Sequence, residues 1–189
     1  NLRAAINVAD NGDSQAEDHL TQIARSPYAP TEVLKYLIEA TSDRIRSDLA
    51  KNPNTPAATL RKLAAGDSIS VAVSVAKNPS APFDVLARLL TPRSNRHARA
   101  ITSFAARHPK LTWRVRTEEG PNGTRHAFYP LSAADRTPLQ GDGGEALVFY
   151  SDLPRHTRTL CGILQNPNTK ARALEAAYKD VQSDLKALE

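Results

Sequence analysis

The sequence repeats a short pattern of proline and leucine at a fixed interval. Pro27, Pro53 and Pro79 stand 26 residues apart. Two series of leucines keep that interval, one at Leu34, Leu60 and Leu86 and the other at Leu37, Leu63 and Leu89. A period of this length with matched apolar positions is typical of stacked supersecondary units. We therefore expect a helical-repeat solenoid, in which short helices bury their apolar faces by stacking on one another.

Each copy of the pattern predicts a proline-containing turn followed by two short helices. A residue that precedes proline avoids the helical region, so the turn ends the helix before it. In the first copy the first helix is predicted over residues 31–40, with Thr31 as its N-cap. In the second copy Gly66 is the expected C-cap. The second helices carry Ile45 and Leu49 in the first copy and Val71 and Val75 in the second.

Two further helices are predicted before the first copy. Residues 2–9 are rich in alanine and aliphatic side chains, which predicts a short helix that caps the array. Ser14 followed by Glu17 is a capping-box pattern, and it predicts a helix that runs to Ala24. In the third copy the second helix is expected over about residues 96–107, because its apolar side chains keep helical spacing.

After Pro109 the pattern changes from helical to extended. Residues 112–117 alternate apolar and polar side chains, as a half-buried strand does. An Asn-Gly step within residues 119–123 is a strong hairpin signal, and residues 125–131 and 146–150 supply two more predicted strands. The intervening residues from 137 to 144 are expected to form a loop.

The repeat returns after these strands. A helix is predicted over residues 156–164, the Asn-Pro-Asn-Thr sequence of the second copy recurs at 166–169, and a last helix is expected over about 170–188. We therefore predict a mainly α fold, a helical-repeat solenoid with a small inserted three-strand sheet. Its parts are the repeats at 1–110, the β insertion at 111–154, and a closing repeat with a capping helix at 155–189, all in one continuous domain.

The repeated motif is Ala-(Lys/Arg)-Asn-Pro-Xaa-(Thr/Ala)-Pro followed by two leucines three residues apart. It stands at Ala50–Leu63 and Ala76–Leu89, and more weakly at Ala24–Leu37 and Gln165–Ala177. This motif resembles that of the bacterial leucine-rich repeat variant family, over about residues 24–110 and 156–180. The resemblance implies a right-handed, HEAT-like superhelix of alternating α and 3₁₀ helices. It implies no catalytic residues, because the family shares none.

Two features depart from that family. The period here is longer than its usual one, and the segment 111–154 is foreign to it. Some members also carry an iron–sulfur cluster held by cysteines ahead of the repeats. This chain has a single cysteine, Cys161, so no such cluster is expected.

Basic side chains are concentrated in one part of the chain. The formal net charge is +5, and no Asp or Glu stands between Val85 and Thr117. One cation recurs at the same position of successive copies, as Arg25, Lys51, Lys77 and Arg107. Spaced cations bind nucleic-acid backbones because neutralised phosphates release their counterions. The candidate nucleic-acid-binding residues are Lys51, Lys77, Arg88, Arg93, Arg96, Arg99, Arg107, Lys110, Arg114 and Arg116.

Each of these candidates also has a structural interpretation. A cation at a helix C-terminus stabilises the helix dipole by about 0.3–1 kcal/mol without any ligand, and we favour this for the recurring column. For the acid-free stretch 85–117 both interpretations stay open. Trp113 and Tyr129 could stack on a base, although a lone Trp in an alternating strand more often packs inward. Asparagines before proline, Asn52, Asn78 and Asn166, are expected to bond local backbone.

The sequence therefore predicts a binding module that is not an enzyme and needs no cofactor. Cys161 lies among aliphatic residues and is expected in the core, and the five histidines show no metal-ligand spacing. No apolar run approaches the roughly 20 residues of a membrane-spanning helix, and a single cysteine fits a reducing compartment, so we expect a cytoplasmic protein. The partner is predicted to be a nucleic acid or another protein.

Two alternatives stay open beside nucleic-acid binding. One is a protein-interaction scaffold that uses the concave helical face or the β insertion. The other is a glycosylase-like enzyme acting on an extruded base, with Trp113, Asp142 or Asp152 as the residues to consider.

Overall fold

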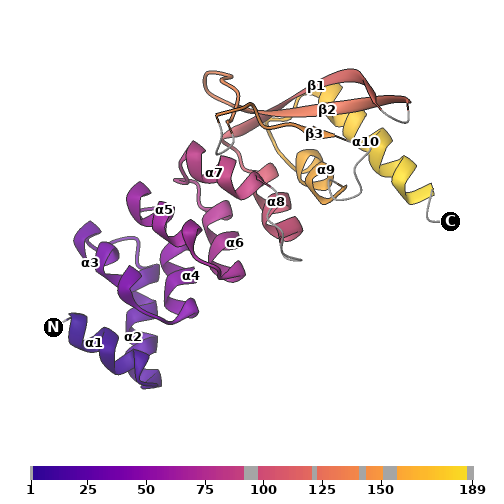
Figure 1. The fold of residues 1–189 in the computed structure, drawn as a ribbon. Coiled ribbons are helices and arrows are strands. Elements are labelled where there is room, and N and C mark those ends of the chain that lie inside the picture. Colours follow the sequence, from indigo (N-terminus) through magenta and orange to yellow (C-terminus); the bar gives the residue numbers. More distant parts are fainter. Residues whose placement is uncertain (1, 92–97, 121–122, 141–143, 151–156, 187–189) are drawn as a thin grey trace. The chain divides into compact units, whose positions relative to one another are not determined.

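The chain is mainly helical, with one small antiparallel sheet (Figure 1). The computed structural model describes residues 2–91, 98–120, 123–140, 144–150 and 157–186. The backbone divides into two compact units, residues 1–85 and residues 86–189. Helix α7 (Phe83–Leu90) contains the division.

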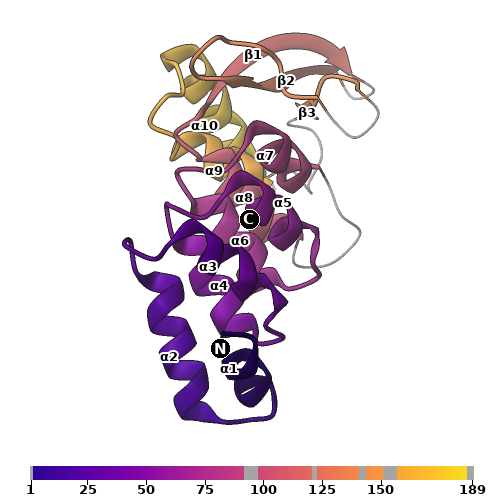
Figure 2. The same ribbon diagram turned by 90° about the vertical axis from the view of Figure 1, so that its left-hand side faces the viewer.

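Unit 1 is built from short helices joined by proline-containing turns. Its helices are α1 (Leu2–Asp10), α2 (Ser14–Arg25), α3 (Thr31–Tyr36), the 3₁₀ helix η1 (Leu37–Glu39), α4 (Asp43–Lys51), α5 (Ala57–Ala65) and α6 (Ile69–Lys77). Helices α2, α4 and α6 lie side by side (Figures 1 and 2). They end at the recurring cations Arg25, Lys51 and Lys77.

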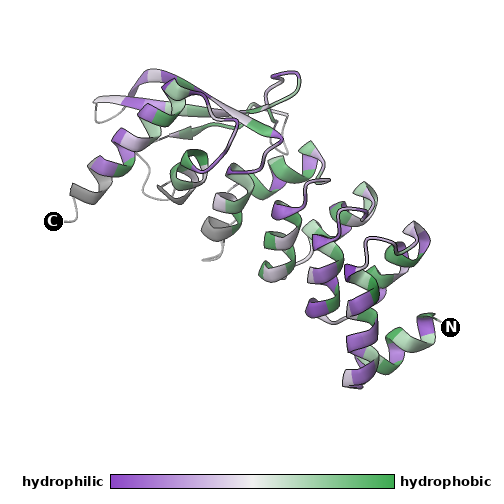
Figure 3. Cartoon of the chain, turned by 180° about the vertical axis from the view of Figure 1, so that it is seen from behind, coloured by the Kyte–Doolittle hydropathy of each residue, from purple (hydrophilic) through white to green (hydrophobic). Residues whose placement is uncertain are grey.

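The apolar positions of the sequence pattern form the core of unit 1. Leu34 and Leu60 are completely buried, as are Ile45 and Leu49. Hydrophilic residues lie on the same helices (Figure 3), as expected where one face of each helix is buried and the other meets solvent. Leu86, which continues the leucine series in unit 2, is buried as well.

Asparagine side chains join consecutive turns in unit 1. The carboxamide nitrogen of Asn52 donates to the carbonyl oxygens of Ala24 at 2.7 Å and Ser26 at 2.8 Å. Asn78 makes the same two bonds one copy later, to Ala50 at 2.7 Å and to Asn52 at 2.9 Å. The side-chain oxygen of each asparagine also accepts the amide hydrogen two residues ahead. The expected local bonds are therefore present, and the bonds to the preceding turn are an additional finding.

Unit 2 uses the same device. The carboxamide of Asn166 donates to the carbonyls of Ala106 and His108, at 2.9 Å each. His108 stands where the second and third copies carry Asn52 and Asn78, and its Nδ1 accepts the amide hydrogen of Lys110 at 3.1 Å. An imidazole nitrogen thus replaces the carboxamide oxygen in this turn. In addition to the end of α7, the described helices of unit 2 are α8 (Ala98–Ala106), α9 (Thr157–Leu164) and α10 (Ala171–Lys186).

The sheet of unit 2 has the strand order β1-β2-β3, with β1 (Leu111–Gly120), β2 (Gly123–Ser132) and β3 (Phe149–Tyr150). The β1–β2 hairpin pairs Leu111 with Ser132 and Gly120 with Gly123. The strands expected over 112–117 and 125–131 are thus confirmed and longer than predicted. The third strand, predicted over 146–150, is shorter and contains only Phe149 and Tyr150. Among the described residues before it, Pro138 pairs with Leu131 and Ala146 with Gln140 through isolated bridges.

One face of the hairpin packs on helices. Trp113 is 2% exposed, its indole N–H donates to the carbonyl of Ala106 at 2.9 Å, and its ring meets Phe149 edge-on at 5.7 Å. His126 of β2 lies 3.0 Å from the carboxylate of Asp180 in α10. These contacts hold the hairpin against α8 and α10.

Two predicted helix caps are wrong. Helix α2 is capped by Asp13, whose carboxylate accepts the amide hydrogens of Gln15 and Ala16 at 2.9 Å, so Ser14 is the first helical residue. A charged carboxylate one position earlier is the stronger acceptor for these amides. Pro30, rather than Thr31, is the N-cap of α3, which has no side-chain cap. Gly66 is the C-cap of α5, as expected.

Replacing Asn78 with alanine should destabilise the protein by about 2–3 kcal/mol, because two buried carbonyls and one amide lose their partner. The free energy of unfolding from urea denaturation measures this loss. Asn54→Ala is the matched control, since Asn54 makes an exposed bond to Pro27. It should cost less than about 1 kcal/mol. Equal losses in the two variants would contradict the role given to Asn78.

Helices α8 and α9 contact each other at Gly162. A Cβ atom there would lie 2.4 Å from the Ser103 carbonyl oxygen and 2.8 Å from Cβ of Ala106. Gly162→Ala should therefore lower stability by about 1–3 kcal/mol through overpacking. The control is Gly66→Ala, whose new Cβ would meet only the Leu63 carbonyl oxygen at 3.5 Å. A thermal melt in which both variants match the parent would refute this close contact.

Candidate functional site

Two of the recurring cations in unit 1 are engaged by one buried carboxylate. Asp48 in α4 has a side chain only 3% exposed and lies 2.9 Å from both Arg25 Nη2 and Lys51 Nζ. Both cations end their helices, so each also faces the negative end of a helix dipole. These contacts support the structural interpretation of this part of the column.

The two cations determine the charge state of Asp48. Burial alone raises the pKa of this carboxyl, but the hydrogen bonds from Lys51 and Arg25 outweigh it and hold the pKa below its usual 3.8. Asp48 is therefore ionised at neutral pH, and its charge is compensated within the protein.

The other members of the column differ from one another. Lys77 ends α6 and is exposed. In unit 2 the guanidinium of Arg107 lies 4.1 Å from the centre of the Phe104 ring and donates to Gln165. Lys110, two residues after His108, is half-buried. Lys77 thus belongs to unit 1, whereas Arg107 and Lys110 belong to unit 2.

The predicted arginines of 88–116 lie on helices α7 and α8 and on strand β1, and two of them fall outside the described residues. Arg88 is exposed in the last turn of α7, and Arg99 is in the first turn of α8. Arg93 and Arg96 lie outside the described residues. Arg114 and Arg116 are exposed on β1, two positions apart and therefore on the same face of the strand. Arg116 lies over the Tyr129 ring at 5.5 Å.

Tyr129 is committed to contacts within the sheet. Its hydroxyl donates to Glu118 at 2.6 Å, and this bond, together with burial, raises the pKa of Tyr129 above its usual 10.0. Trp113 is buried beneath the strand. The indole of Trp113 is therefore not presented for stacking on a base, and the Tyr129 side chain is half-buried. Cys161 is half-buried, and Asp142 and Asp152 lie outside the described residues.

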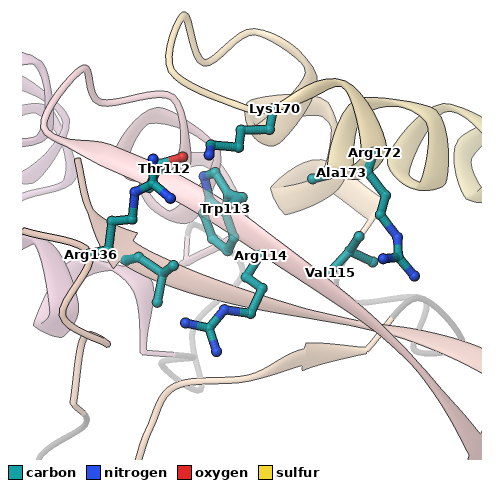
Figure 4. A pocket seen from close by; sticks show the side chains of 9 residues that line it. Thr112, Trp113, Arg114, Val115, Arg136, Lys170, Arg172 and Ala173 are labelled. Carbon is teal, nitrogen blue, oxygen red and sulfur yellow. The ribbon is translucent and has the colours of Figure 1, made fainter.

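A basic pocket lies in unit 2 where β1 meets the start of α10 (Figure 4). Its volume is about 240 Å³. Its basic lining residues come from three segments: Arg114 on β1, Arg136 after β2, and Lys170 and Arg172 at the start of α10. Trp113, Val115 and Leu131 contribute apolar surface. We call this the Arg136–Lys170 pocket.

Among the residues that the structure describes, none is an acidic partner of the four cations of this pocket. No Asp or Glu lines it, and among the described residues no carboxylate lies within the 4.0 Å limit for an ion pair with any of them. In Figure 4 the side chains of Arg136 and Lys170 extend toward each other beside Thr112. Those of Arg114 and Arg172 extend away from that pair, in different directions.

The end of α10 adds to this positive charge. The Lys170 carbonyl accepts the first helical bonds, from the amides of Ala173 and Leu174. This N-terminal end of the helix carries the positive partial charge of the helix dipole. Lys170 and Arg172 therefore sit at the helix end where a cation is unfavourable, and the first turn holds no acidic residue. An anion in the pocket would relieve this repulsion.

A hollow in unit 1 provides a contrast. It has a volume of about 590 Å³, and its charged lining residues are Asp43, Arg46, Lys62 and Asp67. The two carboxylates balance the two cations. The larger hollow thus has no net preference for an anion, whereas the Arg136–Lys170 pocket does.

Sequence reasoning found Arg114 but missed Arg136, Lys170 and Arg172. The sequence pattern predicts a capping helix that contains Lys170 and Arg172, and it predicts neither a strand nor a loop at Arg136. The hairpin register was the signal that could have placed Arg136. Once Leu111 pairs with Ser132, the turn after β2 must lie near the start of β1. Arg136 has a left-handed backbone, with φ of 61°, in a turn held by the Asp135 carboxylate and Thr137.

Comparisons with known proteins do not identify the chain. No protein-family model matches the sequence, and no curated protein and no solved structure matches it. Among the described side chains, no group of His, Cys, Asp and Glu could hold a metal ion. None of the described helices combines the length and the apolar character needed to cross a bilayer.

The Asp48 contacts predict a pH-dependent stability. The pKa is lower in the folded state, so the ionised carboxylate favours folding above about pH 3.8, the usual pKa of an Asp side chain. This contribution is lost as pH falls through the folded-state pKa. At pH 7, Asp48→Asn should lower the free energy of unfolding by about 1.5–3 kcal/mol. The difference from the parent should fade below pH 3.8, and a constant difference would contradict the assignment.

Proposed function

We propose that this chain is a non-enzymatic binding module that docks a polyanionic partner, most simply a nucleic-acid backbone, on a basic surface of unit 2. The observation that supports this is the Arg136–Lys170 pocket. Four cations from three segments line it, none has a carboxylate partner among the described residues, and the positive end of α10 lies beside it. Such a site gains free energy from an anion, because binding replaces repulsion with charge-assisted hydrogen bonds.

The proposed site contains two of the basic residues that the sequence predicted, Arg114 and Arg116. Arg25 and Lys51 are compensated by Asp48, and Arg107 contacts Phe104 and Gln165. Arg114 and Arg116 remain in the proposed site, because both are exposed on β1 beside the pocket. The site would bind phosphates without reading bases, since Trp113 and Tyr129 are committed elsewhere.

We further propose that the chain is a right-handed helical-repeat solenoid of the leucine-rich repeat variant type, from a bacterial cytoplasm. Recurrence supports this. The bonds of Asn78 reproduce those of Asn52 at a 26-residue offset, and Asn166 reproduces them in unit 2. A motif whose copies make equivalent contacts is what stacked units require. The solenoid would present the β1–β2 hairpin as an insertion on a repetitive scaffold.

One observation favours a protein partner as a second candidate. β1 is an edge strand, hydrogen-bonded only to β2 among the described strands. Hydrogen-bonded and non-hydrogen-bonded residue pairs alternate along an antiparallel ladder. The backbone amide of Ala133 donates to the carbonyl of Lys110, so this pair is hydrogen-bonded and the next pair, Leu111–Ser132, is not. The backbone groups of Trp113, Val115 and Thr117 therefore point away from β2. An extended acidic segment could pair with them.

The first test is binding to a labelled single-stranded oligonucleotide across a salt series. Affinity should fall steeply with salt, because each neutralised phosphate contributes about 0.7 to the logarithmic slope. The double variant Arg114→Gln, Arg136→Gln should reduce this slope by about 1.4 units. Undetectable binding at low salt would refute the proposal. So would binding that does not depend on salt.

The matched control removes two charges from unit 1. Arg44 pairs with Asp18 at 2.8 Å and Arg61 with Asp84 at 2.6 Å, and both are exposed. The double variant Arg44→Gln, Arg61→Gln should leave affinity and slope unchanged. Equal losses in both double variants would mean that net charge alone drives binding. Capture of a protein partner that survives nuclease and high salt would favour the second candidate instead.

A further inference from the structure

The Arg136–Lys170 pocket is small and highly charged for its size. Its volume of about 240 Å³ is below the roughly 300–1,000 Å³ of pockets that enclose a drug-sized ligand. A compact anionic group fits it better than a nucleotide base or a folded peptide. A phosphate group is compact and presents acceptor oxygens in several directions.

The arrangement of cations favours a doubly charged group. Arg136 and Lys170 extend toward each other beside Thr112, next to the first turn of α10 (Figure 4). A phosphodiester within a strand carries a single negative charge. A terminal phosphate carries about −1.5 to −2 at pH 7, with three acceptor oxygens. The terminal group therefore matches two cations and a helix N-terminus better than an internal one does.

The surroundings of the pocket leave little else for a ligand to contact. The indole of Trp113 forms part of the pocket wall, yet the residue is 2% exposed and its N–H is bonded to Ala106. Thr112 uses its hydroxyl to donate to the carbonyl of Asn168 at 2.8 Å. The charged side chains are thus the groups that can recognise a ligand here.

We propose that the Arg136–Lys170 pocket binds the terminal phosphate of a nucleic-acid strand, an inference that rests on the proposed polyanion-binding function. Arg136 supplies a planar guanidinium able to form two parallel hydrogen bonds to phosphate oxygens. Lys170 supplies a compact point charge, and the positive end of the α10 dipole lies beside the pocket.

The following phosphodiesters continue along β1. Arg114 and Arg172 line the same pocket but extend away from the Arg136–Lys170 pair. Arg116 lies two residues beyond Arg114 on the same face, about 7 Å further along the strand. In this arrangement Arg136 and Lys170 bind the terminal phosphate of the nucleic acid, and Arg114, Arg116 and Arg172 bind the phosphodiesters that follow it.

The experiment compares oligonucleotides of one sequence that end in a 5′-phosphate, a 3′-phosphate or hydroxyl groups only, with the full chain at fixed ionic strength. A terminally phosphorylated strand should bind about tenfold more tightly than the hydroxyl strand, the gain expected from charge-assisted bonds to one phosphate. A longer hydroxyl strand of equal total charge is the control for simple electrostatics, and it should not reproduce this gain.

Variants assign the preference to the pocket. Arg136→Gln with Lys170→Gln should abolish the preference for a phosphate end, so that this variant binds the phosphate-ended and hydroxyl strands with equal affinity. Arg44→Gln with Arg61→Gln should retain the preference. Thermal melts of both double variants establish that they are folded. In the parent, the preference should decline between pH 7.5 and pH 5.5, because the second pKa of a phosphomonoester is about 6.

The outcomes separate this inference from the proposed function. Equal binding of phosphate-ended and hydroxyl strands, with a steep salt slope, would overturn the terminal-phosphate site and leave polyanion binding intact. No binding of any strand would overturn both. Competition by a nucleoside monophosphate at the affinity of the strand would mean that the free phosphate compound, rather than the strand, is the ligand. Binding of a phosphopeptide in preference to all strands would refute a nucleic-acid ligand.

Discussion

The buried carboxamides of Asn52, Asn78 and Asn166 make the hydrogen bonds on which the stacking of the turns depends. A turn between two short helices leaves carbonyl and amide groups that lie too deep to reach water. Asn78 satisfies two carbonyls of the preceding turn and one amide of its own, and it is only 1% exposed. Because unpaired buried backbone groups are costly, the turns can be buried only if such a residue occupies that position. The leucines fill the core, but the asparagines set the spacing between turns.

The fold followed from the sequence wherever periodicity was strong. The 26-residue interval placed helices α3 to α6, and alternation with the Asn-Gly step placed β1 and β2. Helix starts were less predictable, because Asp13 and Ser14 are both good capping residues and local geometry decided between them. The candidate site was the least predictable part. Arg136 and Lys170 are separated by 33 residues, and their proximity depends on how the hairpin packs on α10, which no local pattern encodes.

The two groups of cations show how context changes the meaning of a basic residue. Arg25 and Lys51 stand at the C-terminal ends of their helices and share the carboxylate of Asp48, so their charges are matched within the protein. Lys170 and Arg172 stand at the opposite end of a helix, with no acidic side chain in its first turn. The same residue types are thus stabilising in one place and unfavourable in the other. Only the second arrangement invites an external anion.

The bonds between asparagines and the preceding turn also affect how such a chain can change in length. Asn52 and Asn78 bind equivalent groups: in each case the side chain donates to the backbone carbonyls of the residues 28 and 26 positions earlier in the chain. Removing residues 52–77 as a block would place Asn78 at the chain position of Asn52, in register with the carbonyls of Ala24 and Ser26. A deletion that moved Asn78 out of this register would leave those buried carbonyls unpaired. We therefore expect the helical part of unit 1 to lengthen or shorten in blocks of 26 residues, the interval between Asn52 and Asn78.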